Sequence, residues 1–167
     1  AKYTQAQITG IDISQGMLDF GIKKIAQKKL NKRITLQKAD SENLPFNNNS
    51  FDAITAGFGV RNFENLNKGL SEMHRVLNTN GMVAILEPST PKFFPLKKLY
   101  NLYFHHVLPI IGSWISKDKN AYKYLPESVD AFPSEGEFIA KLEKAGFKEC
   151  KHFSLTFGIV SLYVAIK

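Results

Sequence analysis

The sequence predicts an α/β protein with a doubly wound, mostly parallel β-sheet that ends in an antiparallel hairpin. Short apolar segments with strand character alternate with segments whose apolar residues recur at helical spacing, which is the pattern of repeated β-α units. Polar residues follow the ends of the early strands, where open α/β sheets bind their ligands. A length of 167 residues fits a single domain over residues 1–167.

The first half of the chain contains the regular part of this pattern. Amphipathic helices are predicted where apolar residues return every three or four positions, and strands where short apolar runs lie between turn residues. The segment at 82–86 is apolar throughout, as expected for a strand covered on both faces. The predicted elements are, in order, a strand at 7–13, a helix at 15–30, strands at 34–37 and 51–56, a helix at 66–77 and a strand at 82–86.

Prolines interrupt the alternation in the second half. Pro88, Pro91 and Pro95 lie close together and predict an insertion over about residues 88–133 that covers the substrate site. A capping-box sequence at 134–137 then begins a helix. The last 20 residues predict two strands around residues 156–158, which would form an antiparallel hairpin at the sheet edge.

Composition excludes several classes of protein. No apolar run approaches the roughly 20 residues of a membrane-spanning helix. Cys150 is the single cysteine, so one copy of the chain can hold neither a disulfide nor a cysteine-rich metal site. The chain does not open with a signal-peptide pattern. We therefore expect a cytoplasmic protein without a metal ion, and the sequence leaves open a homodimer.

The formal charge of +7 has two separate sources. Lysines along residues 23–33 fit a solvated helix face that ends in cations. Lysines between residues 92 and 123 are instead interleaved with aromatic and aliphatic residues. Such a segment can lie on the inner face of a membrane or cover an apolar ligand, and an ordinary core helix with exposed lysines is the competing interpretation. Nucleic acid is not expected as a partner, because no nucleic-acid motif accompanies the charge.

Two acidic residues follow neighbouring predicted strands. Asp12 ends the first strand, and Asp40, with Ser41 beside it, comes just after the second. A carboxylate at such a strand end accepts hydrogen bonds from ribose hydroxyls or an adenine amino group. The alternative for Asp12 is that it only caps the helix that follows.

A glycine-containing strand exit follows the third predicted strand. Gly57 and Gly59 would let the backbone approach a ligand, although a plain turn has the same composition. Arg61 and Asn62 place donors at the same edge of the sheet. An ion pair between Arg61 and a surface acid is the structural alternative.

Seven motifs in the same order identify a family resemblance. They are Asp-Ser-Glu-Asn-Leu-Pro-Phe at 40–46, Phe-Gly-Val-Arg-Asn at 58–62, and the segments 72–77, 86–89, 122–128, 145–147 and 155–159. Tyr-Lys-Tyr-Leu-Pro-Glu-Ser at 122–128 is the most specific of them. With these motifs the chain resembles the UbiE/MenG family, the C-methyltransferases of ubiquinone and menaquinone biosynthesis, over essentially its whole length.

The resemblance implies a Rossmann-like class I methyltransferase fold with S-adenosylmethionine as cofactor and S-adenosylhomocysteine as product. The cofactor contacts would fall on Asp12, Asp40, Ser41 and Gly57. The family's usual first strand and glycine-rich loop are missing, because Ala1 lies shortly before the second strand of that fold. We therefore expect an N-terminally truncated methyltransferase domain.

The resemblance also implies the substrate, a demethylated prenyl quinol of either the naphthoquinol or the benzoquinol type. Arg61, Asn62 and His106 would face this quinol, with Arg61 stabilising a phenolate and His106 or a water molecule accepting the proton. Three alternatives stay open: methylation of another hydrophobic small molecule, a basic RNA-binding protein, and an inactive interaction module.

Overall fold

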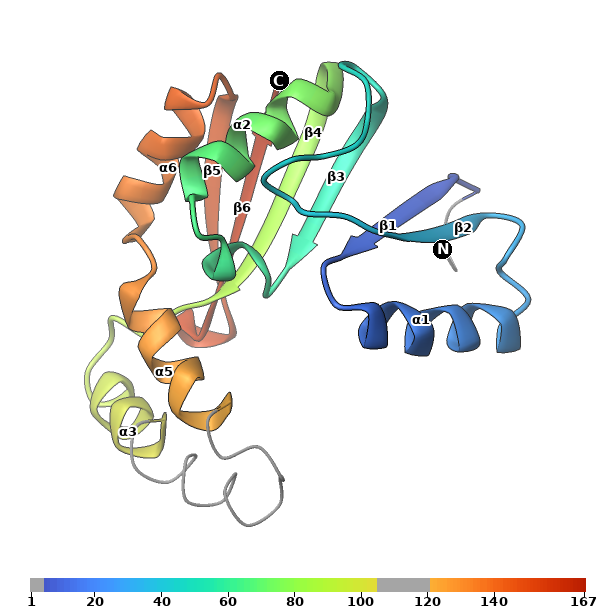
Figure 1. Cartoon of the computed structure of the whole chain (residues 1–167). Helices are drawn as coiled ribbons and strands as arrows, with labels where there is room; N and C mark the ends of the chain where they lie inside the picture. Colours follow the sequence, from blue (N-terminus) through green and yellow to red (C-terminus); the bar gives the residue numbers. More distant parts are fainter. Residues whose placement is uncertain (1–4, 105–120) are drawn as a thin grey trace.

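The computed structural model describes residues 5–104 and 121–167 and has an α/β architecture (Figure 1). β1 (Ile8–Asp12) and β2 (Ile34–Lys38) pair in parallel, and α1 (Gln15–Gln27) packs beside them. A larger sheet has four strands in the order β3-β4-β6-β5. These strands are β3 (Phe51–Gly57), β4 (Leu77–Pro88), β6 (Val160–Ile166) and β5 (Lys148–Leu155).

The predicted fold class is confirmed, with one difference in how the strands are grouped. β3 and β4 are parallel, and β5 and β6 form the predicted antiparallel hairpin, with β6 also antiparallel to β4. The parallel strands are divided between two sheets, because β1 pairs with β2 and β3 pairs with β4 while no pairing joins β1 to β3. The smaller sheet therefore lies beside the β3 edge of the larger one in Figure 1.

Two helices cover one face of the larger sheet. They are α2 (Leu66–Val76) and α6 (Glu135–Lys144), and the predicted capping box at the start of α6 is present. Leu70 of α2 and Phe138 of α6 are fully buried against alternate strand residues such as Ile85. Burial of these apolar side chains is the main stabilising term for this part of the fold.

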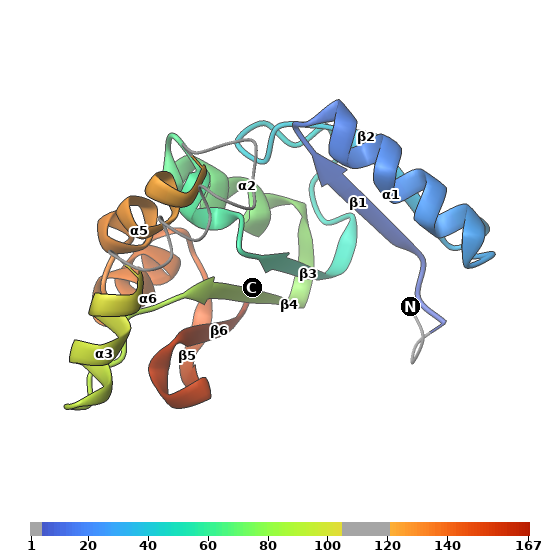
Figure 2. The same cartoon turned by 90° about the horizontal axis from the view of Figure 1, so that it is seen from below.

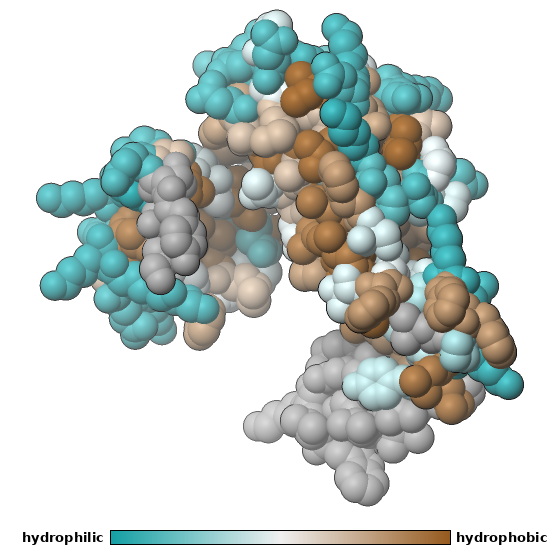
Figure 3. Space-filling model, turned by 180° about the vertical axis from the view of Figure 1, so that it is seen from behind, coloured by the Kyte–Doolittle hydropathy of each residue, from teal (hydrophilic) through white to brown (hydrophobic). Residues whose placement is uncertain are grey.

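The opposite face of the four-stranded sheet is also apolar (Figure 3). Met82 of β4 and Phe153 of β5 are 43% and 47% exposed there. The two faces differ because successive side chains of a strand point to opposite sides of the sheet. In the described part of the chain, α2 and α6 cover only the first face.

The predicted insertion contributes two described helices, α3 (Leu96–Leu102) and α5 (Ala121–Ala131). Together with α6 they gather at one end of the molecule in the view from below (Figure 2). α5 also packs against the short 3-10 helix η1 (Val60–Asn62), which follows β3. None of the described helices is long and apolar enough to cross a membrane.

Candidate active site

The predicted cofactor residues lie where parallel strands end. Asp12 is the last residue of β1, Asp40 follows β2 by two residues, and Gly57 is the last residue of β3. Figure 1 shows that β1 and β3 end on the same side of the molecule. This is the edge at which open α/β sheets bind ligands.

Asp12 is not the helix cap that one interpretation of the sequence expected. Ser14 occupies the N-cap of α1, and its side chain accepts the Met17 amide at 3.4 Å. Asp12 Oδ1 instead accepts the Ser14 amide at 2.8 Å. This turn fixes the Asp12 carboxylate at the strand end, and among the described hydrogen bonds Oδ2 takes part in none.

Asp40 and Ser41 belong to a loop whose backbone is fixed at several points. Asp40 Oδ1 accepts the Glu42 amide at 2.8 Å, which closes a turn around Ser41. Glu42 Oε1 in turn accepts the Asn65 amide at 2.9 Å, which ties the loop to the N-cap of α2. These contacts fix the backbone of the loop on both sides of Ser41.

Glu72 and Arg75 of α2 hold the rest of this loop. Arg75 donates to the backbone carbonyl oxygens of Leu44 at 2.9 Å and Phe46 at 2.7 Å. Glu72 Oε2 accepts the Leu44 amide at 2.8 Å, and Oε1 pairs with Arg75 Nε at 2.7 Å. The hydrogen bond from Arg75 is the main cause that lowers the pKa of Glu72, so the pair stays ionised at neutral pH.

Gly57 leaves open space at the end of β3. A Cβ atom built there would meet no heavy atom within 4 Å. The turn that follows takes its left-handed backbone at Phe58, with φ 58°, and not at a glycine. Phe58 is also 47% exposed, so both the conformation and the exposure of this aromatic residue are unusual.

Arg61 forms a buried ion pair with Glu87, the fully buried acid near the end of β4. Glu87 Oε2 lies 3.1 Å from Arg61 Nη1, and Oε1 accepts the Val60 amide at 2.7 Å. The alternative pairing with a surface acid is therefore wrong in its partner, because the Arg61 and Glu87 side chains are only 11% and 1% exposed.

The insertion helix α5 also contacts both predicted donors. Arg61 Nε donates to Ser128 Oγ at 3.2 Å, and Nη1 donates to the carbonyl oxygen of Phe58. The Tyr124 hydroxyl donates to Asn62 Oδ1 at 2.9 Å. The structure thus brings Arg61 and Asn62 together under α5, while His106 lies outside the described residues.

Sequence reasoning missed Glu87, Ser128 and Tyr124 as members of this site. One local signal could have identified Glu87, because an acid at the end of an otherwise apolar strand needs a partner when it is buried. Ser128 and Tyr124 belong to the family motif at 122–128, but they are 67 and 62 residues from their partners, so the motif did not reveal these contacts.

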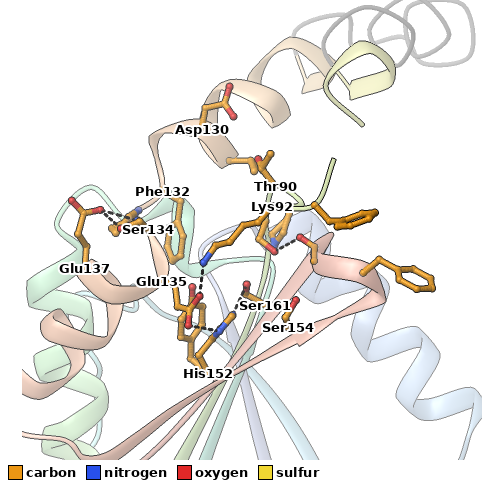
Figure 4. Close-up of a pocket in the computed structure, with 18 residues that line it drawn as sticks. Thr90, Lys92, Asp130, Phe132, Ser134, Glu135, Glu137, His152, Ser154 and Ser161 are labelled. Carbon is orange, nitrogen blue, oxygen red and sulfur yellow. Dashed lines mark hydrogen bonds and ion pairs between the residues drawn. The ribbon is translucent and has the colours of Figure 1, made fainter. Parts of the chain in front are cut away.

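Two neighbouring cavities open beside this cluster. One, of about 480 Å³, is lined by Arg61, Tyr124 and Ser128 among others. The second, of about 600 Å³, lies between α6 and the β5-β6 hairpin and is shown in Figure 4. Phe132 and Pro133 line both cavities, so the two spaces share a wall.

The fold matches solved structures that include methyltransferases. A SAM-dependent methyltransferase from Aquifex aeolicus aligns with a TM-score of 0.69 at 18% identity, over 98% of this chain and 70% of that one. The [4+2]-cyclase SpnF aligns with a TM-score of 0.71 at 16% identity, over 100% of this chain and 68% of that one. The chain therefore has the fold of the class I S-adenosylmethionine-dependent methyltransferases.

Sequence comparison then identifies the family. The model of the ubiE/COQ5 methyltransferase family matches residues 2–167. The demethylmenaquinone methyltransferase of Bacteroides fragilis is 46% identical over 96% of this chain, and the C-methyltransferase UbiE of Geotalea daltonii is 47% identical over 98%. The chain spans 66% of the first relative and 69% of the second. It belongs to the ubiE/COQ5 methyltransferase family.

Replacement of Glu87 should test the ion pair. Glu87→Ala leaves the Arg61 guanidinium buried without its partner and should lower the free energy of unfolding by about 3–5 kcal/mol. Urea denaturation followed by circular dichroism measures this. Glu149→Ala, which removes an exposed pair with Lys151, should cost less than about 1 kcal/mol. Equal losses in the two variants would contradict a structural role for the Glu87 pair.

Proposed function

We propose that this protein transfers a methyl group from S-adenosylmethionine to a ring carbon of a demethylated prenyl quinol, with demethylmenaquinol as the first candidate. The observation that carries the proposal is the family match over residues 2–167. Relatives with 46% and 47% identity bear names of demethylmenaquinone and ubiquinone/menaquinone methyltransferases, so both ring types belong in the test.

The residues at the strand ends fit an adenosyl ligand. Ribose hydroxyls and the adenine amino group are donors, and the carboxylates of Asp12 and Asp40 are acceptors with one oxygen each outside the local turns. The open space at Gly57 allows close approach to the backbone. When bound, S-adenosylmethionine supplies an electrophilic methyl group on a sulfonium.

Arg61 is suited to stabilise charge on the substrate oxygen. Its Nη1 and Nε atoms are fixed by Glu87, Phe58 and Ser128, which holds the guanidinium in one orientation. Methylation at a ring carbon requires that the neighbouring phenol develop negative charge. A cation that is already oriented stabilises this charge without reorganisation. Asn62, hydrogen-bonded to Tyr124, would orient the ring.

The insertion supplies a surface suited to an anionic membrane and to the prenyl tail. Phe93 and Phe94 are 72% and 73% exposed, and Leu99 on α3 is 65% exposed. Lys97 and Lys98 of α3 are exposed beside them. Exposed apolar side chains next to lysines favour the headgroup region of a bilayer that carries negative charge.

A product assay tests the proposed reaction. The protein incubated with methyl-labelled S-adenosylmethionine and demethylmenaquinol should yield labelled menaquinol, identified by mass spectrometry. Demethylated benzoquinol in a parallel reaction determines the ring type. Turnover of neither quinol, in protein that binds S-adenosylhomocysteine, would contradict the proposed substrate class.

The cofactor residues are tested by binding. Asp12→Ala and Asp40→Ala each remove a charged acceptor and should weaken S-adenosylhomocysteine binding about 10- to 150-fold, which corresponds to 1.5–3 kcal/mol. Isothermal titration calorimetry measures the affinity. Asp19→Ala on α1 is the matched control, because its carboxylate contacts Gln15 in the described structure. An unchanged affinity for both test variants would reject these two contacts.

Membrane association is tested by co-sedimentation with vesicles of phosphatidylcholine and phosphatidylglycerol. The protein should sediment with the anionic vesicles and be released at about 1 M salt, since charge attraction is then screened beyond about 3 Å. The double variant Phe93→Ser, Phe94→Ser should sediment several-fold less. Phe20→Ser changes an aromatic residue with 64% exposure on α1 and should bind as the wild type does. Salt-independent binding, or none, would argue against this surface.

A further inference from the structure

His152 lies at the centre of a hydrogen-bonded chain in the larger cavity (Figure 4). Its Nδ1 atom is 2.9 Å from Glu135 Oε1, and its Nε2 atom is 2.9 Å from Ser161 Oγ. The three residues come from α6, β5 and β6, so the tertiary fold brings them together. An acid, an imidazole and a hydroxyl in this order form a proton-accepting unit.

The charge on Glu135 determines which ring nitrogen of His152 carries hydrogen. Glu135 Oε2 also accepts a hydrogen bond from Lys92 Nζ at 2.8 Å, and this contact is the main cause that lowers the pKa of Glu135. An ionised carboxylate can only accept, so His152 Nδ1 must donate to it. In the neutral ring Nε2 is then the acceptor, and the Ser161 hydroxyl donates to it.

The same order of residues occurs in serine hydrolases, but Ser161 is not placed as a nucleophile. It lies in the middle of the sheet, paired with Glu87 of β4 on one side and Ser154 of β5 on the other. Ser161 lines the cavity although it is only 6% exposed. Its peptide group therefore belongs to the sheet and is not available to stabilise an oxyanion. The chain is better suited to take a proton from a ligand.

The cavity around His152 is a partly open cleft with aromatic and polar walls. Its volume of about 600 Å³ lies within the usual range of about 300–1,000 Å³. Phe93, Phe132 and Phe157 supply aromatic surface, and Ser89 and Ser154 supply hydroxyls. Pro88, where β4 ends, is also part of the lining, so the cavity opens at the edge where the parallel strands β3 and β4 end.

We propose that this cavity binds the hydroxylated ring of an aromatic substrate and that His152 is the terminal acceptor of its phenolic proton. The phenol proton moves to Ser161 Oγ as the Ser161 proton moves to His152 Nε2, and the electron pair of the broken O–H bond stays on the ring oxygen. Glu135 stabilises the imidazolium that forms. The inference rests on the proposed methylation, for which the phenolate makes the ring carbon nucleophilic.

Several charged and titratable groups surround His152, and Asp130 of α5 and Glu137 of α6 line the same cavity. Glu135 of α6 and Lys92 after β4 form one side of the cluster. The Tyr163 ring of β6 is tilted against the His152 ring with 5.0 Å between the centroids, and burial raises the pKa of Tyr163, so it stays neutral. Glu87 of β4 lies across the strand pair from Ser161, but its carboxylate is paired with Arg61. Glu135 is thus the acid that serves His152.

Steady-state methylation of the quinol by the wild-type protein and its variants tests the proposal. His152→Gln should lower kcat about 100-fold or more while the KM for S-adenosylmethionine stays unchanged. Added imidazole should restore part of the activity of His152→Ala.

Glu135→Gln should show an intermediate loss of about 10-fold, within the range for an orienting partner.

His74→Gln is the matched control, because His74 packs against Phe147 and does not line the cavity. It should keep the activity and pH profile of the wild type. Unchanged S-adenosylhomocysteine affinity and circular dichroism show that each variant is folded. Wild-type kcat in folded His152→Gln at every pH would overturn the inference and leave the proposed methylation intact.

A binding measurement separates this inference from the proposed function. If the wild type methylates neither quinol, the proposed reaction is wrong. The cavity can then be tested by itself with 2-naphthol, a stable compound that carries a hydroxylated aromatic ring. Its addition should shift the NMR signals of the His152 ring in the wild type and leave those of His74 unchanged. Naphthol binding without a shift at His152, or no binding up to its solubility limit, would overturn the cavity assignment.

Discussion

The buried ion pair between Glu87 and Arg61 is the interaction on which the candidate active site depends. A carboxylate without solvent is costly unless donors surround it, and Glu87 receives the Val60 amide and the Arg61 guanidinium. These contacts join β4 to η1, and Arg61 then joins η1 to Ser128 of α5. One buried acid therefore determines where the strand exit lies, how the guanidinium is oriented and where the insertion helix packs.

A second ion pair, between Glu72 and Arg75, positions the loop that follows Asp40. Glu72 and Arg75 project from α2 and bind backbone atoms of the loop that follows Asp40. The apolar core holds α2 in place. The loop has little apolar surface of its own, so its contacts with α2 determine its position. Charged side chains therefore position both the loop after Asp40 and the turn that contains Arg61. These side chains come from α2 and β4, which also contribute to the apolar core.

The sequence predicted those features that depend on local pattern. Apolar periodicity identified the strands and helices, the spacing of Ser134 and Glu137 identified a capping box, and strand ends identified Asp12 and Asp40 as neighbours of one edge. It could not predict the contacts of Arg61 with Glu87, 26 residues away, or of His152 with Glu135. Periodicity tells which face of a strand is buried, but it does not tell which polar groups meet there. Sequence reasoning named His106 as a proton acceptor from the family resemblance, and this stays a prediction because His106 lies outside the described residues. It did not consider His152.

The two cavities share Phe132 and Pro133, and the proposed mechanism would give Arg61 and His152 different tasks beside them. An arginine stays protonated at physiological pH and can stabilise a phenolate, but it cannot accept the proton that makes one. An imidazole can accept that proton, but it then carries a positive charge that needs a carboxylate beside it. Glu87 pairs with Arg61, and Glu135 contacts both Lys92 and His152. Under the proposed mechanism, proton removal and charge stabilisation would therefore use different carboxylates.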